Sequence, residues 1–203
     1  MPYYKLELVK AAILVFIDGL GIGPRDTASN PLACFEPLAL DCCFAAPGPP
    51  GDGRLCLSTD ATLGVAGLPQ SATGQTALLT GINAAAVLGR HLHGYPNLAL
   101  RSLLERESIF HRLLKSGRSV SFANTYTPGF FLRRPRWISA STVMCESAGV
   151  RLNQLQDLCA GQSLYMDFTN RLLVEAGVQV SEQTPEQAGR TLAAISDRFD
   201  FCF

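Results

Sequence analysis

An apolar run that ends in a carboxylate and then in glycines occupies Ile13-Leu-Val-Phe-Ile-Asp18-Gly-Leu-Gly-Ile-Gly23. Apolar β-branched residues followed by glycines are typical of a buried parallel strand that ends at the mouth of an α/β sheet. We therefore expect a strand over residues 11–17 that brings Asp18 to the carboxyl edge of that sheet. The whole chain is then expected to be an α/β protein with a mostly parallel central sheet.

A second motif is a hydroxyl-rich loop that runs into an apolar segment, Gly67-Leu-Pro-Gln-Ser-Ala-Thr-Gly-Gln-Thr76-Ala-Leu-Leu-Thr-Gly81. A hydroxyl at a helix N-terminus lies among backbone N–H groups without helical partners, where phosphate is readily bound. We expect Thr76 to stand at the start of such a helix. The alternative is an ordinary threonine in the first turn of the helix, with Ser71 or Thr73 as the cap.

Helices and strands alternate along the rest of the chain, as expected for an α/β fold. The best helix start is Thr184-Pro185, which pairs a capping hydroxyl with proline at the first helical position. The apolar end of the chain is expected to form a strand, either at a sheet edge or leading toward a missing part. The predicted helices are 98–115, 141–148, 152–159, 165–176 and 184–198, and the further strands are 119–124 and 199–203.

Composition excludes several classes of protein. Seventeen basic and seventeen acidic residues cancel among 203, so no overall field favours nucleic acid or an anionic membrane. The apolar run over residues 11–17 is too short for a bilayer crossing, and the charged residues before it do not fit an export signal. Seven irregularly spaced cysteines indicate reduced thiols rather than a disulfide or zinc framework. We expect a cytoplasmic protein that binds neither nucleic acid nor membrane.

Asp18 has three interpretations. It is a metal ligand, since carboxylate oxygen suits hard cations, or it is a turn residue beside the glycines. The glycines of Gly19–Gly23 also suggest a dinucleotide-binding turn, with Asp41 placed for a ribose. Pro24 and Pro31 disfavour that reading, because they interrupt the helix that should follow.

Three segments together resemble the alkaline phosphatase superfamily, in particular the cofactor-independent phosphoglycerate mutase and phosphopentomutase group. They are Asp18-Gly-Leu-Gly21, the segment Gly67–Thr76 and Gly89-Arg-His-Leu-His93-Gly-Tyr-Pro-Asn97. The resemblance implies an alkaline-phosphatase-like α/β sandwich over residues 1–203, with a small cap segment near 125–180. It also implies a metal-dependent phosphomutase or phosphatase that works on a small phosphorylated substrate.

The resemblance assigns roles to two residues. Asp18 matches a ligand of the first metal, and Thr76 matches a nucleophile that also contacts metal and becomes phosphorylated. Two divalent ions are implied, manganese or zinc, with magnesium as an alternative. Metal coordination would lower the pKa of the hydroxyl and align it for attack.

The same resemblance implies further metal ligands, an Asp-x-x-x-His element and a later Asp-His, that do not occur after the last predicted strand. We therefore expect the fold to be incomplete at its C-terminal side. The alternative function is a truncated, catalytically inactive relative that keeps the fold and weak anion binding.

Substrate contacts are predicted at Arg90, His91 and His93, on the rim of the site. For the two histidines, metal binding and an ordinary surface loop stay open as alternatives. Asn124 is added because it ends a predicted parallel strand, where site residues gather.

A dense basic cluster, Arg133-Arg134-Pro-Arg136, is read as a solvated loop, with a phosphate clamp as the alternative. His111 is expected to have a structural role within its helix.

Overall fold

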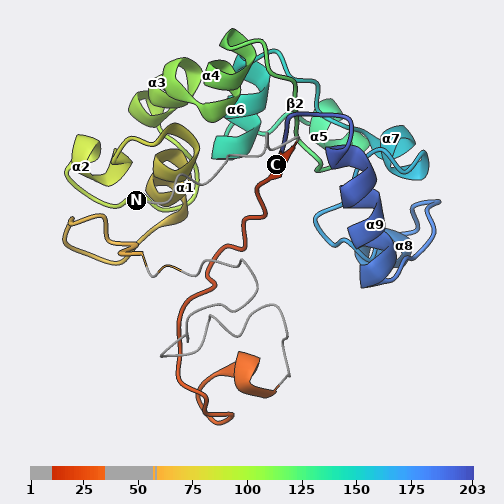
Figure 1. The fold of residues 1–203 in the computed structure, drawn as a ribbon, viewed down its shortest axis with the longest axis horizontal. Helices are drawn as coiled ribbons and strands as arrows, with labels where there is room; N and C mark the ends of the chain where they lie inside the picture. Colours follow the sequence, from red (N-terminus) through yellow and green to blue (C-terminus); the bar gives the residue numbers. More distant parts are fainter. Residues whose placement is uncertain (1–10, 35–56, 58) are drawn as a thin grey trace, which may run out of the picture. The chain divides into compact units, whose positions relative to one another are not determined.

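The computed structural model describes residues 11–34, 57 and 59–203, and it is α/β (Figure 1). None of the helices in this part of the chain combines the length and the apolar character that a bilayer crossing needs. The strands are β1 (Ala12–Ile13), β2 (Val120–Ser121) and β3 (Phe201–Cys202), and Pro31–Cys34 forms a short 3₁₀ helix, η1. The α-helices are α1 (Ser71–Thr80), α2 (Ala84–Leu88), α3 (Leu98–Glu107), α4 (Ile109–Lys115), α5 (Pro128–Leu132), α6 (Ala140–Ser147), α7 (Leu155–Cys159), α8 (Arg171–Glu175) and α9 (Pro185–Ser196).

The three strands form one parallel sheet in the order β1-β3-β2. This confirms the predicted α/β class with a parallel sheet. The expectation that the apolar run at 199–203 pairs at a sheet edge is wrong, because β3 lies between the two other strands. Asp200 fixes its start: the carboxylate accepts bonds from the Ser119 backbone N–H and hydroxyl, both 2.8 Å, and from Arg118 at 3.1 Å.

β1 is parallel, as predicted, but it is not buried. In the described part of the chain it pairs with β3 over a short stretch, with the Ala12 N–H donating to the Asp200 carbonyl at 2.9 Å and the Leu14 N–H donating to the Cys202 carbonyl at 2.8 Å. Beyond this short ladder the apolar side chains stay accessible; Val15 is 64% exposed and Ile17 is 52% exposed. Asp18 therefore does not stand at the end of a buried strand.

The helix predicted over 98–115 is two helices, α3 and α4, that meet at Ser108. The backbone of Ser108 is extended, with ψ at 151°, and its side chain is fully buried. Its hydroxyl lies 2.9 Å from His111 Nδ1, and His111 Nε2 lies 3.1 Å from the Ser147 carbonyl oxygen. The break is thus held from α6, and the structural role expected for His111 is confirmed.

The helix predicted over 165–176 is reduced to α8. Asp167 accepts bonds from the Thr169 hydroxyl at 2.6 Å and from the Leu172 N–H at 2.8 Å. Asn170 has φ at +64°, in the left-handed region that interrupts a helix. By contrast, α9 begins as predicted, with Thr184 as its N-cap and Pro185 in its first turn.

The described residues divide into two compact units, each considered by itself. One contains residues 11–15 and 62–203, and the other residues 16–34, 57 and 59–61. In the larger unit, α1, α3 and α6 pack on one another (Figure 1). Its main core joins these helices to α4, β2 and β3 through Leu79, Leu104, Phe110, Val120, Val143, Met144 and Phe201.

Candidate functional site

Two of the three motif segments lie side by side in the larger unit. The loop after α2 docks on the start of α1, where the Ala72 N–H donates to the Leu92 carbonyl at 3.2 Å. In return the Leu92 N–H donates to the Thr73 hydroxyl at 3.3 Å. Beneath this contact, Ala72 packs in a small apolar cluster with Ala84 and Leu100. The spacing of the motifs along the sequence therefore corresponds to a real contact between them.

The two histidines of the motif, in the loop after α2, contact the loop that leads into α1. His93 Nδ1 lies 2.8 Å from Gln70 Oε1, and His91 Nε2 lies 3.1 Å from the Val65 carbonyl oxygen. His91 is partly buried, whereas His93 and Arg90 are exposed. Two of the predicted substrate-contact residues, His91 and His93, thus contact the loop that precedes the predicted nucleophile helix.

Thr76 does not stand at the start of a helix. α1 begins at Ser71, which puts Thr76 in the second turn, where its side chain is fully buried. Its hydroxyl donates to the Ala72 carbonyl oxygen at 2.7 Å, and Thr80 makes the same bond to the Thr76 carbonyl. Hydroxyls that bond back to the preceding turn are common in helix interiors. The expected position is wrong, and the role of Thr76 as nucleophile stays a prediction.

Ser71 is the hydroxyl residue that the sequence reasoning placed in the background. It is the first residue of α1 and is partly buried, and Gln70 is the N-cap without a side-chain capping bond. The sequence offers Ser71 as an alternative cap of this helix, whereas in the structure it is the first helical residue.

Asp18 lies in the smaller unit, in an exposed turn. The Leu20 N–H reaches the Ile17 carbonyl at 3.4 Å, and Gly19 has φ at +77°, which favours glycine. This geometry fits the alternative that Asp18 forms a turn with the glycines. Thr76 and the histidines belong to the larger unit, so the pairing of Asp18 with Thr76 stays a prediction. Asp41, named for the dinucleotide alternative, falls outside the described residues.

Asn124 is exposed and lies three residues beyond β2, because the strand predicted over 119–124 is reduced to Val120–Ser121. It forms an isolated parallel bridge with Leu164. The basic cluster nearby in sequence lies in an exposed loop, as predicted. Arg134 pairs with Glu146 and lies 4.7 Å from the centre of the Phe130 ring, and Arg136 lies 5.3 Å from that of Trp137.

Within residues 11–34, 57 and 59–203, no three histidine, cysteine, aspartate or glutamate side chains lie together in a group suited to a metal ion. Two residues are expected to hold metal: Asp18 belongs to the smaller unit and Thr76 to the larger one. The donor set seen in either unit alone therefore does not form a metal centre.

Comparisons with protein-family models, with curated proteins and with solved structures found no match to this chain.

Proposed function

We propose that this chain is a metal-dependent phosphoryl-transfer enzyme in which a hydroxyl of α1 carries the phosphoryl group. One observation supports the proposal: two hydrogen bonds hold the hydroxyl-rich start of α1 against the loop with His91 and His93, one from the Ala72 N–H to the Leu92 carbonyl and one from the Leu92 N–H to the Thr73 hydroxyl. Imidazole N–H groups beside a helix start suit the oxygens of a phosphorylated substrate.

In the proposed step, the hydroxyl oxygen bonds to phosphorus while the bond from phosphorus to the leaving alcohol breaks. The hydroxyl loses its proton, and the leaving alcohol gains one. Transfer of the phosphoryl group to water would make the enzyme a phosphatase, and transfer to the product would make it a mutase. Divalent ions, when bound, would lower the pKa of the hydroxyl and balance charge on phosphorus.

Two hydroxyls compete for the attacking role. Ser71 stands in the first turn of α1, near the positive end of the helix dipole. Thr76 keeps the role that the family resemblance gives it, but its buried hydroxyl must first leave the Ala72 carbonyl. The Ala72 N–H already donates to Leu92, so a phosphate at this helix start would use other donors.

The test is turnover of an aryl phosphate by the full chain with manganese or zinc. Of Ser71→Ala and Thr76→Val, we expect only the variant that removes the attacking hydroxyl to lower turnover, by about 1000-fold or more. Thr80→Val is the matched control, because Thr80 makes the same bond to the preceding turn from the same helix. Mass spectrometry of acid-quenched enzyme would locate the phosphorylated residue.

The alternative function is an inactive relative with the fold and weak anion binding. Failure to turn over or to form a phosphoenzyme with either manganese or zinc would favour this alternative. Metal-dependent turnover that survives both Ser71→Ala and Thr76→Val would remove the nucleophile from α1.

A further inference from the structure

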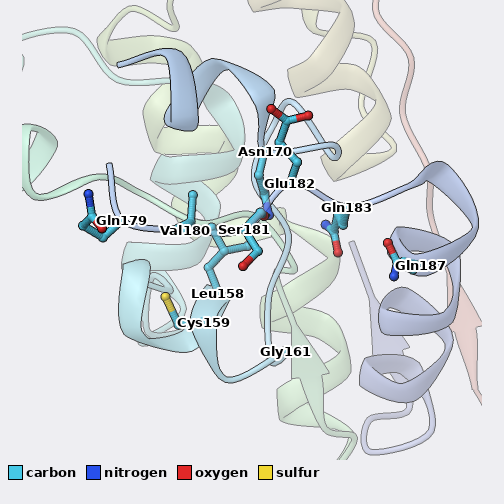
Figure 2. Close-up of a pocket in the computed structure, with 10 residues that line it drawn as sticks. All are labelled: Leu158, Cys159, Gly161, Asn170, Gln179, Val180, Ser181, Glu182, Gln183 and Gln187. Atoms are coloured by element: carbon cyan, nitrogen blue, oxygen red, sulfur yellow. The ribbon is translucent and has the colours of Figure 1, made fainter. Parts of the chain in front are cut away.

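A hollow of about 630 Å³ opens in the larger unit between the end of α7, the segment before α9 and the first turns of α9 (Figure 2). Its volume suits a small molecule. Its lining is rich in amides and contains one carboxylate and no basic residue: Leu158, Cys159, Gly161, Asn170, Gln179, Val180, Ser181, Glu182, Gln183 and Gln187.

The most telling residue of the lining is Asn170. Its side chain is only 6% exposed, and its Nδ2 donates to the Ser181 carbonyl oxygen at 3.0 Å. Its Oδ1 is buried and has no hydrogen-bond partner. Buried side-chain oxygens are nearly always bonded, so an unpartnered one calls for a donor from outside the chain.

The side chains of two neighbouring glutamines are held by hydrogen bonds within the chain. Gln183 uses its Nε2 to reach the Phe168 carbonyl at 2.7 Å, which turns its donor away from a ligand. Gln187 Oε1 accepts from the Thr184 N–H at 2.7 Å and is held in place by the α9 cap. Glu182 supplies the one charge of the lining, and it is negative.

We propose that this hollow binds a small molecule without negative charge that donates hydrogen bonds from hydroxyl or ammonium groups, with Asn170 Oδ1 as the anchoring acceptor. A donor placed there satisfies the buried oxygen, and an ammonium group also meets the Glu182 carboxylate. A phosphorylated ligand is disfavoured, because the lining offers no cation against Glu182. The site stands independently of the phosphoryl transfer proposed for α1.

The test is titration of the full chain with glucosamine, glucose and glucose 1-phosphate, followed by calorimetry and by the side-chain amide NMR signals. These probes carry hydroxyls with an ammonium group, hydroxyls alone, and hydroxyls with an anion. We expect glucosamine or glucose to shift the Asn170 amide signal and the phosphorylated sugar to bind at least about tenfold more weakly.

Variants separate the contributions. Asn170→Gly suits the left-handed backbone and should weaken binding about tenfold or more. If the ammonium group is recognised, Glu182→Gln should weaken the binding of glucosamine and leave the binding of glucose unchanged. If the hydroxyls suffice, it should change the binding of neither sugar. Glu175→Gln, on α8 outside the lining, is the control and should change nothing.

The proposal is overturned if neither uncharged nor cationic probe shifts the Asn170 signal in the wild-type chain. It is equally overturned if the folded Asn170→Gly variant binds as the wild type does. Because the wild-type signal is read directly, failure of a variant to fold does not leave the question undecided.

Discussion

At the scale of single residues, Asp157 is a nearly buried carboxylate that accepts three hydrogen bonds. Its side chain is 8% exposed, and its two oxygens accept bonds from Arg151 at 2.7 and 2.9 Å. The Gln154 N–H adds a third bond at 2.7 Å. The hydrogen bond from Arg151 is the main cause that holds the pKa of Asp157 below its usual value, although burial works against it.

We predict that Asp157→Asn lowers the free energy of unfolding by about 1–3 kcal/mol at neutral pH, because it removes a charge that receives three hydrogen bonds. A carboxyl with a lowered folded pKa stabilises the fold above its unfolded pKa of about 3.9, and this contribution is lost as pH falls through the folded value. The gap between wild type and variant should therefore be constant above about pH 5 and shrink below about pH 4. Urea unfolding across this range measures it.

The control is Glu175→Gln, which breaks the exposed Arg171–Glu175 pair on α8. Exposed pairs contribute little, so its effect should stay below about 0.5 kcal/mol. A wild-type to Asp157→Asn gap that stays unchanged down to about pH 3 would contradict the assigned role of the Asp157 charge.

At the scale of elements, α9 is held by a capping box at its start and by apolar packing near its end. The Thr184 hydroxyl accepts from the Gln187 N–H at 3.3 Å, while Gln187 Oε1 accepts from the Thr184 N–H at 2.7 Å. Farther along the helix, Ile195 packs with Ala123 and Cys202 in a small buried cluster. The helix is therefore fixed at its start by the cap and near its end by the sheet.

We predict that Thr184→Ala lowers the free energy of unfolding by about 1 kcal/mol, since one first-turn N–H loses its acceptor. Thr184→Ser keeps the hydroxyl and should stay within about 0.5 kcal/mol of wild type. Urea unfolding monitored by circular dichroism compares the two. Equal loss in both variants would mean that the threonine methyl group, and not the cap, stabilises the helix.

The same elements explain what the sequence could predict. The start of α9 was predictable because the cap is local. The break at Ser108 was not, because it depends on His111 reaching α6. The helix predicted over 165–176 starts later because Asp167 accepts bonds from Thr169 and Leu172 in a turn before α8. At the candidate site, two of the grouped motif segments, α1 and the loop after α2, are in contact, and the third, with Asp18, lies in the smaller unit. The position of Thr76 was wrong because a start at Ser71 moves it by more than one turn.

At the scale of the whole molecule, β3 lies between β1 and β2, and its side chains pack into the apolar clusters of the larger unit. Phe201 packs edge-on against Phe110, with ring centres 6.1 Å apart, and Cys202 is fully buried on the next position. Cys145, on α6, is fully buried in the main core. The reactivity of these two thiols, one on α6 and one on β3, therefore measures how tightly the larger unit is packed.

We predict that Cys145 and Cys202 react with iodoacetamide only when the chain unfolds, whereas the exposed Cys34 and Cys159 react in the native state. Burial raises the pKa of Cys202 to about 11 and raises that of Cys145 as well. The thiolate is the reacting form, so burial both blocks access and removes the nucleophile at neutral pH. Peptide mass spectrometry after timed labelling assigns each rate.

The comparison of the two buried thiols makes this a test of the sheet. If β3 is inserted between its neighbours, Cys202 can react only when the ladder with both strands opens, and its rate should fall with Cys145 rather than with Cys34. If β3 instead sat loosely at an edge, fraying would expose Cys202 while the main core around Cys145 stayed closed. Native-state labelling of Cys202 at the rate of Cys34 would therefore contradict the central position of β3, whatever the outcome at the candidate site.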